Sequence, residues 1–170
     1  MFRSGAFVAE RLGDLGDEQV QPNGVDLTVT AVFEQTEPGR ITTDGKRVGD
    51  RRELDRTALS PDDRDGDGDG DAPAREGYVL EPGGYVLRYG ETVRIPEQHV
   101  GFVLPRSSLL RNSCTLNTAV WDAGYEGRGE GLLQVHHRIE LEAGARVGQL
   151  VLAAADHSGT YAGDYQGENL

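Results

Sequence analysis

Residues 78–96 read YVLEPGGYVLRYGETVRIP, and this stretch indicates the fold class. Short runs of apolar, aromatic and β-branched residues alternate with the turn residues Pro82, Gly83, Gly84 and Gly90. Runs of this length, bounded by glycine and proline, are typical of strands joined by tight turns. Further strands are expected outward from this stretch, at residues 25–33, 99–104, 131–140 and 147–154. The sequence therefore predicts an all-β barrel or sandwich.

Only one or two short helices are expected within this all-β fold. The apolar residues of segment 5–15 follow a helical spacing, and Ser4 precedes them at a position that suits an N-cap. A second helical turn is expected after Pro105, with Ser107 or Ser108 as its cap.

The apolar signal almost vanishes between residues 50 and 76, where residues 61–71 read PDDRDGDGDGD. Such a composition cannot bury a core. Residues 65–76 also fit the spacing of a calcium-binding loop, but Pro73 interrupts it and its flanks lack helical periodicity, which favours a solvated acidic linker. We expect one domain over residues 1–170, with a disordered acidic insertion at about 50–76 and a flexible C-terminal tail at about 157–170.

The charge of the chain excludes some classes of function. Its 170 residues carry a formal net charge of −12, from 29 acidic and 17 basic residues, and Lys46 is the only lysine. Such an excess of carboxylates is typical of salt-loving organisms and argues against nucleic-acid binding, which needs a basic surface. No apolar run reaches the roughly 18 residues of a membrane span. With Cys114 as the only cysteine, we expect a cytoplasmic protein without disulfides or membrane contact.

Residues 105–111 (PRSSLLR) combine arginines and hydroxyls with a predicted helix start. Free backbone N–H groups at a helix start, serine hydroxyls and forked guanidinium groups all suit phosphate oxygens. An ordinary serine-capped helix with surface arginines has the same pattern, so the spacing alone leaves both interpretations open.

Residues 118–127 (TAVWDAGYEG) place Asp122 after an apolar stretch and before a glycine turn. A carboxylate held at the edge of a buried segment can accept a proton from water, and Tyr125 offers a flat ring for a sugar. A plain β-hairpin with an Asp-Ala-Gly turn is the alternative interpretation. Together with the first motif, the segment suggests chemistry on a nucleotide.

In this order, the motifs resemble those of the dCTP deaminase and dUTPase superfamily, in particular its archaeal dUTPase branch. The resemblance covers most of the chain and lies outside the acidic insertion. It is carried by residues 21–27 (QPNGVDL), 106–111 (RSSLLR), 122–127 (DAGYEG), 144–150 (GARVGQL) and 161–167 (YAGDYQG). Five ordered matches are more specific than any single one.

The resemblance implies a distorted β-barrel that assembles as a homotrimer, with sites between subunits that bind a deoxynucleoside triphosphate and Mg²⁺. It assigns catalysis to Asp122 and leaves Mg²⁺ to the substrate phosphates, without a metal ligand from the protein. The implied binding residues are Arg106, Ser107, Ser108 and Arg111 for the phosphates, Asn117, Thr118, Tyr125 and Gln149 for sugar and base, and Tyr161 and Gln166 in a closing tail. Asp164 and Glu168 depart from the tail pattern, which has a lysine and a glutamine there.

Members that deaminate dCTP use a glutamate ten residues after the central aspartate. That position is Leu132 here, or Gln134 if a two-residue insertion intervenes, and neither side chain ionises. We therefore expect a dUTP diphosphatase that hydrolyses dUTP to dUMP and diphosphate and supplies dUMP for thymidylate synthesis. The alternatives are a dCTP deaminase, alone or bifunctional, and a non-catalytic nucleotide sensor on the same scaffold.

Overall fold

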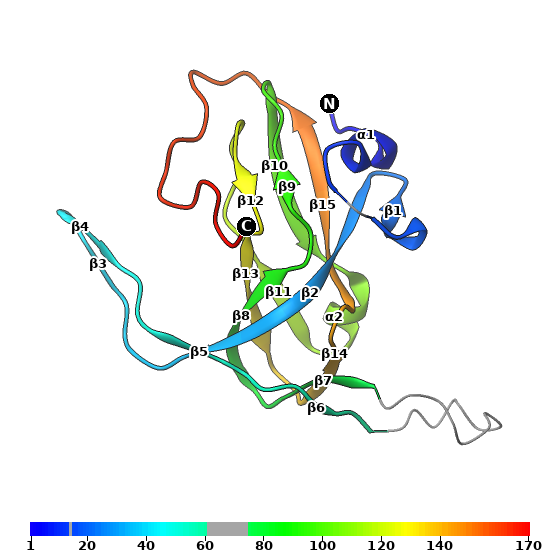
Figure 1. Cartoon of the computed structure of the whole chain (residues 1–170), viewed down its shortest axis with the longest axis vertical. Coiled ribbons are helices and arrows are strands. Elements are labelled where there is room, and N and C mark those ends of the chain that lie inside the picture. Colours follow the sequence, from blue (N-terminus) through cyan, green and yellow to red (C-terminus); the bar gives the residue numbers. More distant parts are fainter. Residues whose placement is uncertain (14, 61–74) are drawn as a thin grey trace.

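The computed structural model describes residues 1–13, 15–60 and 75–170, and it confirms an all-β fold (Figure 1). The helical elements of this part are short: α1 (Gly5–Ala9), the 3₁₀ turn η1 (Asp17–Gln19) and α2 (Ser107–Arg111). The strands are β1 (Val20–Gln21), β2 (Gly24–Gln35), β3 (Arg40–Thr42), β4 (Gly45–Arg47), β5 (Arg51–Glu53), β6 (Thr57–Ala58), β7 (Glu76–Leu80), β8 (Gly83–Tyr89), β9 (Val93–Arg94), β10 (His99–Pro105), β11 (Cys114–Asn117), β12 (Glu126–Gly127), β13 (Glu130–Val135), β14 (Ile139–Glu142) and β15 (Arg146–Ala154).

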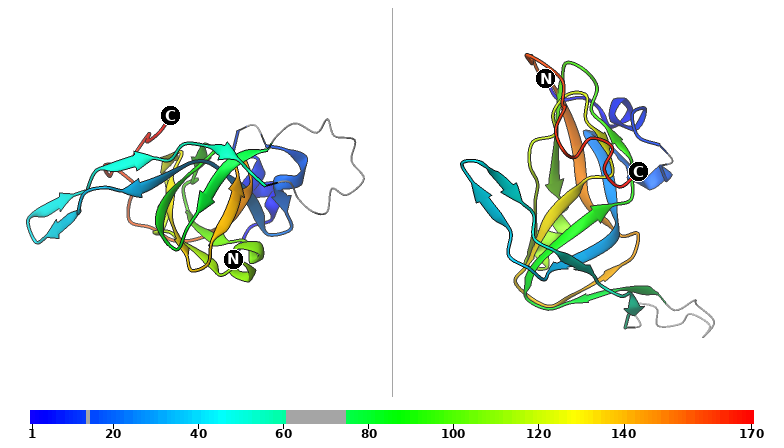
Figure 2. Two further views of the ribbon diagram at one scale, coloured as in Figure 1. Left: turned by 90° about the horizontal axis from the view of Figure 1, so that it is seen from below. Right: turned by 60° about the vertical axis from the view of Figure 1, so that its left-hand side comes forward.

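The main sheet has the strand order β10-β15-β2-β8-β13-β11, and every neighbouring pair is antiparallel. The sheet curls into a distorted, nearly closed barrel (Figure 2). Closure comes from the segment after β11, because Gly101 of edge strand β10 forms an isolated antiparallel bridge with Trp121. An added Cβ at Gly101 would lie 2.8 Å from Ile95 Cδ1 and 3.3 Å from Trp121 Cβ, so glycine leaves room for this close approach.

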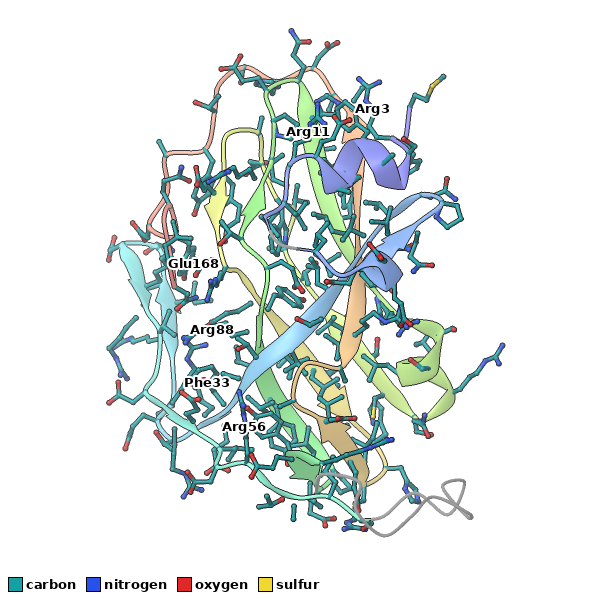
Figure 3. All side chains as sticks on the ribbon, turned by 45° about the vertical axis from the view of Figure 1, so that its right-hand side comes forward. Arg3, Arg11, Phe33, Arg56, Arg88 and Glu168 are labelled. Atoms are coloured by element: carbon teal, nitrogen blue, oxygen red, sulfur yellow. The ribbon has the colours of Figure 1, made fainter. Side chains whose placement is uncertain are left out.

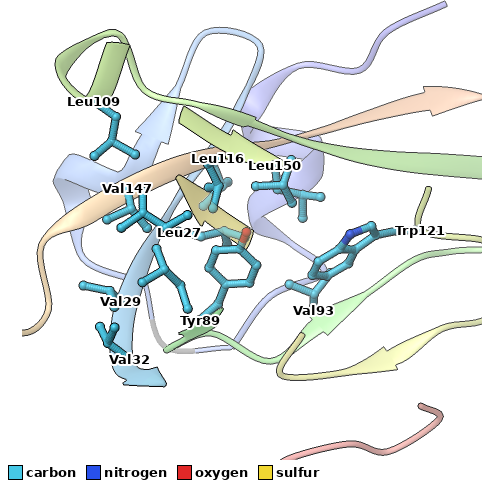
Figure 4. Packing of buried hydrophobic residues seen from close by; sticks show 14 of the residues in the cluster. Leu27, Val29, Val32, Tyr89, Val93, Leu109, Leu116, Trp121, Val147 and Leu150 are labelled. Atoms are coloured by element: carbon cyan, nitrogen blue, oxygen red, sulfur yellow. The ribbon is translucent and has the colours of Figure 1, made fainter. Parts of the chain in front are cut away.

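The inward faces of these strands form one apolar core (Figure 4). The alternation that predicts a strand at residues 25–33 is seen in β2, which buries Val25, Leu27 and Val29. Tyr89 of β8 and Trp121 extend this core toward the open end of the barrel, where their ring centroids lie 6.0 Å apart. The core therefore reaches directly under the segment that carries Asp122.

Two elements differ from their predicted lengths. The N-terminal helix ends at Ala9, and Ser4 caps it by accepting a hydrogen bond from the Phe7 backbone N–H. The predicted strand 131–140 is two strands, β13 and β14, separated by a bend at His136 where the backbone N–H donates to Ser113. A short pattern predicts the extended residues but not where the chain changes partners.

The expectation of disorder at about 50–76 does not hold for the described ends of that segment. Strand β5 pairs with β2, and β6 pairs with β7. These strands lie at the sheet margin and are mostly exposed, so their polar sequence gives no apolar signal. The Asp-Gly repeat and the calcium-loop pattern fall mainly on residues 61–74, which lie outside the described residues.

Strands β3 and β4 form a hairpin that projects from the barrel, here called the arm (residues 40–47; Figures 1 and 2). The C-terminal tail, residues 157–170, runs along the hairpin around Asp122. Backbone hydrogen bonds join Tyr161 to Ala123 and Gly167 to Glu126. No helix in the described part of the chain is long and apolar enough to cross a membrane.

Adjacent residues of β10 test the assignment of the two faces of the sheet. Val103 is 3% exposed and Leu104 is 55% exposed. Val103→Ala should lower the free energy of unfolding by about 2 kcal/mol, from lost burial and the cavity left behind. Leu104→Ala should change it by less than about 0.5 kcal/mol. Denaturant titration of both variants measures the difference, and equal losses would contradict this strand orientation.

Candidate active site

A cavity of about 610 Å³ lies between the hairpin that carries Asp122, the base of the arm and the C-terminal tail. Its lining combines aromatic rings with a few charged groups, the composition of a small-molecule site. The described lining residues are Val48, Arg51, Ala119, Val120, Trp121, Asp122, Tyr125, Gly129, Glu130, Tyr161, Tyr165, Glu168 and Asn169.

Asp122 occupies the turn that follows the barrel-closing residue Trp121. Gly124 adopts a left-handed backbone conformation with φ of +83°, and its N–H donates to Ile95 of the neighbouring segment. Trp121 is buried, whereas Asp122 is exposed and lines the cavity. Among the described residues its carboxylate makes no hydrogen bond or ion pair, so it remains available to accept a proton.

Tyr125 stands inside a row of aromatic rings. Its ring centroid lies 5.2 Å from that of Trp121 and 5.6 Å from that of Tyr161, both in edge-to-face geometry. The Tyr125 hydroxyl donates a hydrogen bond of 2.8 Å to Oε1 of Glu168. Burial raises the pKa of Tyr125, so the phenol stays protonated and keeps donating. The tail therefore covers the ring that the sequence assigns to the sugar.

The two acidic residues that depart from the family tail pattern both have partners on the barrel or arm. Asp164 lies 3.0 Å from Nζ of Lys46 on the arm, and that Nζ lies 4.6 Å from the Tyr165 ring centroid. Gln166, which the sequence assigns to the tail site, donates to the Gly124 carbonyl and accepts from the Glu126 N–H. Asp164 and Glu168 thus hold the tail against the same chain.

A cluster of Arg51, Arg88 and Glu130 flanks the cavity. Arg51 Nη1 lies 2.5 Å from Oε2 of Glu130, and Arg88 Nη2 lies 3.2 Å from its Oε1. The Phe33 ring packs against the guanidinium groups of Arg51 and Arg88, at 5.1 and 4.7 Å. Figure 3 shows Phe33 and Arg88 near each other. Sequence reasoning missed Arg51, because it lies in a segment without an apolar pattern. It assigned no role to Glu130 either.

The predicted phosphate residues lie elsewhere in the chain, at α2. The helix begins at Ser107, so Arg106 takes the N-cap position without a side-chain cap, and the expectation that Ser107 or Ser108 caps it is wrong. Arg106 Nε lies 3.1 Å from Oδ2 of Asp26, a carboxylate only 1% exposed.

Asp26 is shared by a second arginine, since Arg146 Nη1 lies 3.5 Å from its Oδ2. Burial raises the pKa of the Asp26 carboxyl, and both arginines oppose that shift. Gln149, which the sequence assigns to the base, is the register partner of Asp26 on β15 and lies with this second group.

Within one chain the two groups do not meet. The described lining of the cavity includes none of Arg106, Ser107, Ser108 and Arg111, nor Gln149. Helix α2 and the tail lie on different sides of the barrel (Figure 1). Asn117 and Thr118 line a smaller adjoining hollow, which shares Arg51, Ala119 and Glu130 with the main cavity. One chain thus presents two partial sites.

Comparison with known proteins identifies relatives over nearly the whole chain. Residues 2–155 match the family model described as dCTP deaminase-like. A probable deoxyuridine 5'-triphosphate nucleotidohydrolase of Halobacterium salinarum is 58% identical over 168 residues, which cover 99% of this chain and 95% of the relative. A protein of the same description from Aeropyrum pernix is 41% identical, over 89% of this chain and 87% of its own length.

A solved structure also shares the fold. The 2'-deoxycytidine 5'-triphosphate deaminase from Agrobacterium tumefaciens matches with a TM-score of 0.63 at 19% sequence identity. The match covers 91% of this chain, which spans about half (48%) of the length of that structure.

Docking of the tail should depend on pH through Glu168. Burial raises the pKa of its carboxyl, the hydrogen bond from Tyr125 opposes this shift, the charge of Glu130 adds to it, and the charges of Arg51 and Arg88 oppose it. The docked tail therefore binds a proton more tightly than the free tail, so docking is strongest at low pH and weakens as pH rises through the raised pKa. Fluorescence of Trp121, the only tryptophan, should report this transition.

The matched variant is Glu168→Gln, which keeps the shape of the side chain and does not titrate. Its tail should stay docked on both sides of the transition, with a flat fluorescence profile. A variant that keeps the full wild-type pH profile would show that another group controls docking.

Proposed function

The chain belongs to the dCTP deaminase-like family, and we propose that it is a dUTP diphosphatase, which hydrolyses dUTP to dUMP and diphosphate. The observation that carries this proposal is Asp122, a free carboxylate at the rim of an aromatic cavity. The names of the archaeal relatives, at up to 58% identity, support the same activity. We assign it to nucleotide metabolism in the cytoplasm, where it removes dUTP and supplies dUMP for thymidylate synthesis.

In this mechanism Asp122 orients a water molecule and accepts its proton. The water oxygen attacks the α-phosphorus, the bond from that phosphorus to the bridging oxygen breaks, and diphosphate leaves. One water is consumed, and dUMP and diphosphate are the products. Tyr125 packs on the deoxyribose once Glu168 releases its hydrogen bond with the Tyr125 hydroxyl. The tail residues Tyr161 and Gln166 then close over the bound nucleotide.

The phosphates are bound by Arg106, Ser107, Ser108 and Arg111 of a second copy of the chain. Guanidinium groups and the free N–H groups at the start of α2 match phosphate oxygens and offset the charge that develops on them. This arrangement is supported by the separation of the two partial sites within one chain. A cyclic homotrimer supplies each cavity with the α2 of a neighbour.

We treat Mg²⁺ as part of the substrate, bound to the triphosphate oxygens and supplying charge neutralisation there. The described residues do not fit a protein-held metal centre, because no three His, Cys, Asp or Glu side chains among them come together in a way that could hold an ion. The residues that we assign to the phosphates are cationic or hydroxyl-bearing, which suits a magnesium-bound nucleotide rather than the free ion.

Deamination of dCTP is the alternative reaction on this fold. It needs a side chain near the base that gives and accepts protons in turn. Leu132 is apolar, and the Oε1 of Gln134 accepts a hydrogen bond of 3.3 Å from Asn117. Because neither residue ionises, we expect diphosphate from dUTP and no ammonia from dCTP.

Replacing Asp122 should separate catalysis from binding. Asp122→Asn should lower kcat for dUTP by about 10²–10⁴-fold, because an amide cannot accept the proton of water. Affinity for an unreactive dUTP analogue should stay within about threefold, since the arginines and aromatic rings are unchanged. Asp55→Asn, at another exposed aspartate, is the control and should keep wild-type kcat. Full turnover by Asp122→Asn would remove Asp122 from the mechanism.

Mixing two inactive variants tests the shared site. Arg106→Ala and Asp122→Asn should each be nearly inactive alone. After they are denatured together and refolded at equal amounts, about a quarter of the sites should combine an intact Asp122 with an intact Arg106 from its neighbour. Diphosphate release should recover to that fraction of the wild-type rate. If the two groups act within one chain, mixing will restore nothing.

A further inference from the structure

We propose that the Arg51–Glu130 pair selects uracil over cytosine in the nucleotide that the cavity binds. This inference rests on the proposed function and names a residue pair that would determine its base specificity. The pair comes from β5 and β13, far apart in the sequence, and meets at the cavity that Asp122 and Tyr125 also line.

The pair lies where a base would have to go. Arg51 and Glu130 line both the main cavity and the adjoining hollow formed by Asn117, Thr118 and Leu132. A nucleotide whose α-phosphate lies near Asp122 and whose sugar lies on Tyr125 has its base directed away from the turn. The remaining lining includes the polar side chains of Glu168 and Asn169 in the main cavity and of Asn117 and Thr118 in the adjoining hollow. Arg51 and Glu130 are the charged residues that line both hollows.

The pair is held in a fixed orientation. Glu130 forms ion pairs with Arg51 at 2.5 Å and with Arg88 at 3.2 Å, and its side chain is 17% exposed. Phe33 packs against both guanidinium groups and restricts their rotation. Two cations share one carboxylate, so the cluster carries spare N–H donors beside a carboxylate that only accepts. A rigid donor beside a rigid acceptor is a means of recognition.

Uracil matches this arrangement. Its Watson–Crick edge presents a carbonyl oxygen at C4 beside an N–H at N3. A guanidinium of Arg51 can donate to the carbonyl while an oxygen of Glu130 accepts from the N–H. Cytosine reverses both groups, since it has an amino group at C4 and a lone pair at N3. Its amino hydrogens would face the Arg51 donors, and its lone pair would face the carboxylate, leaving buried polar groups unpaired.

The test measures the preference for uracil over cytosine both in equilibrium binding and in hydrolysis. Equilibrium binding of dUMP and dCMP is measured beside the hydrolysis of dUTP and dCTP. The wild-type protein should prefer uracil at least about tenfold in binding, the size of one misplaced hydrogen bond. Glu130→Gln replaces a pure acceptor with an amide that also donates, so it accommodates the cytosine N3. The uracil preference of this variant should fall by at least about tenfold.

A matched control pair exists between β5 and β2. Arg52 of β5 and Glu34 of β2 form an Arg–Glu pair at 2.6 Å that faces solvent outside the cavity. Glu34→Gln should leave the base preference unchanged. Arg51→Met is the second variant and removes the donor to the C4 carbonyl. It is used if thermal unfolding shows that Glu130→Gln is not folded. Its uracil preference should fall in the same way.

The outcomes separate the two proposals. A folded Glu130→Gln or Arg51→Met protein with the wild-type uracil preference overturns the role of the pair, even if dUTP is hydrolysed. Equal wild-type binding of dUMP and dCMP overturns it as well. A wild-type protein that prefers dUMP but hydrolyses no dUTP overturns the proposed function and leaves the base-selecting pair in place.

Discussion

Two backbone hydrogen bonds between Gly101 and Trp121 hold the molecule in its functional form. The Gly101 N–H donates to Trp121 at 2.9 Å, and the Trp121 N–H donates back at 3.1 Å. They join the edge strand β10 to the segment after β11 and so close the curled sheet. The same bonds fix Trp121 in the core and leave Asp122, the next residue, exposed at the barrel rim. Barrel closure and the exposed position of the Asp122 carboxylate therefore depend on the same two hydrogen bonds.

The sequence predicted the barrel well because its strands are short and clearly bounded. The alternation over residues 25–33 corresponds to β2, and the turn residues after Leu80 correspond to the β7–β8 connection. Prediction was weaker where a strand has no apolar face. Arg51–Glu53 pairs with β2, yet its local sequence resembles a linker, since only a partner strand makes it extended.

Individual residues of the candidate site were predicted, but their arrangement in space was not. Local patterns predicted Asp122 at the edge of a buried apolar stretch; Trp121 is buried, but Ala119 and Val120 of that stretch are exposed. These patterns gave no information on which groups share a cavity, because Arg51, Glu130 and Glu168 come from distant segments. Gln149, which the family motif assigns to the base, lies beside Asp26 in the second partial site, and its role stays a prediction. Ser107 was expected to cap the helix, but it is the first helical residue, and Arg106 takes the N-cap position.

The separation of α2 from the Asp122 cavity also matters for the life of the protein in the cell. If the phosphate-binding arginines of each cavity come from a neighbouring subunit, a newly synthesised monomer cannot hydrolyse nucleotide until it assembles with other copies. Specific activity would then rise with protein concentration and disappear on extreme dilution. Nucleotide hydrolysis would begin only after assembly, so the quaternary state itself would act as the safeguard against premature turnover.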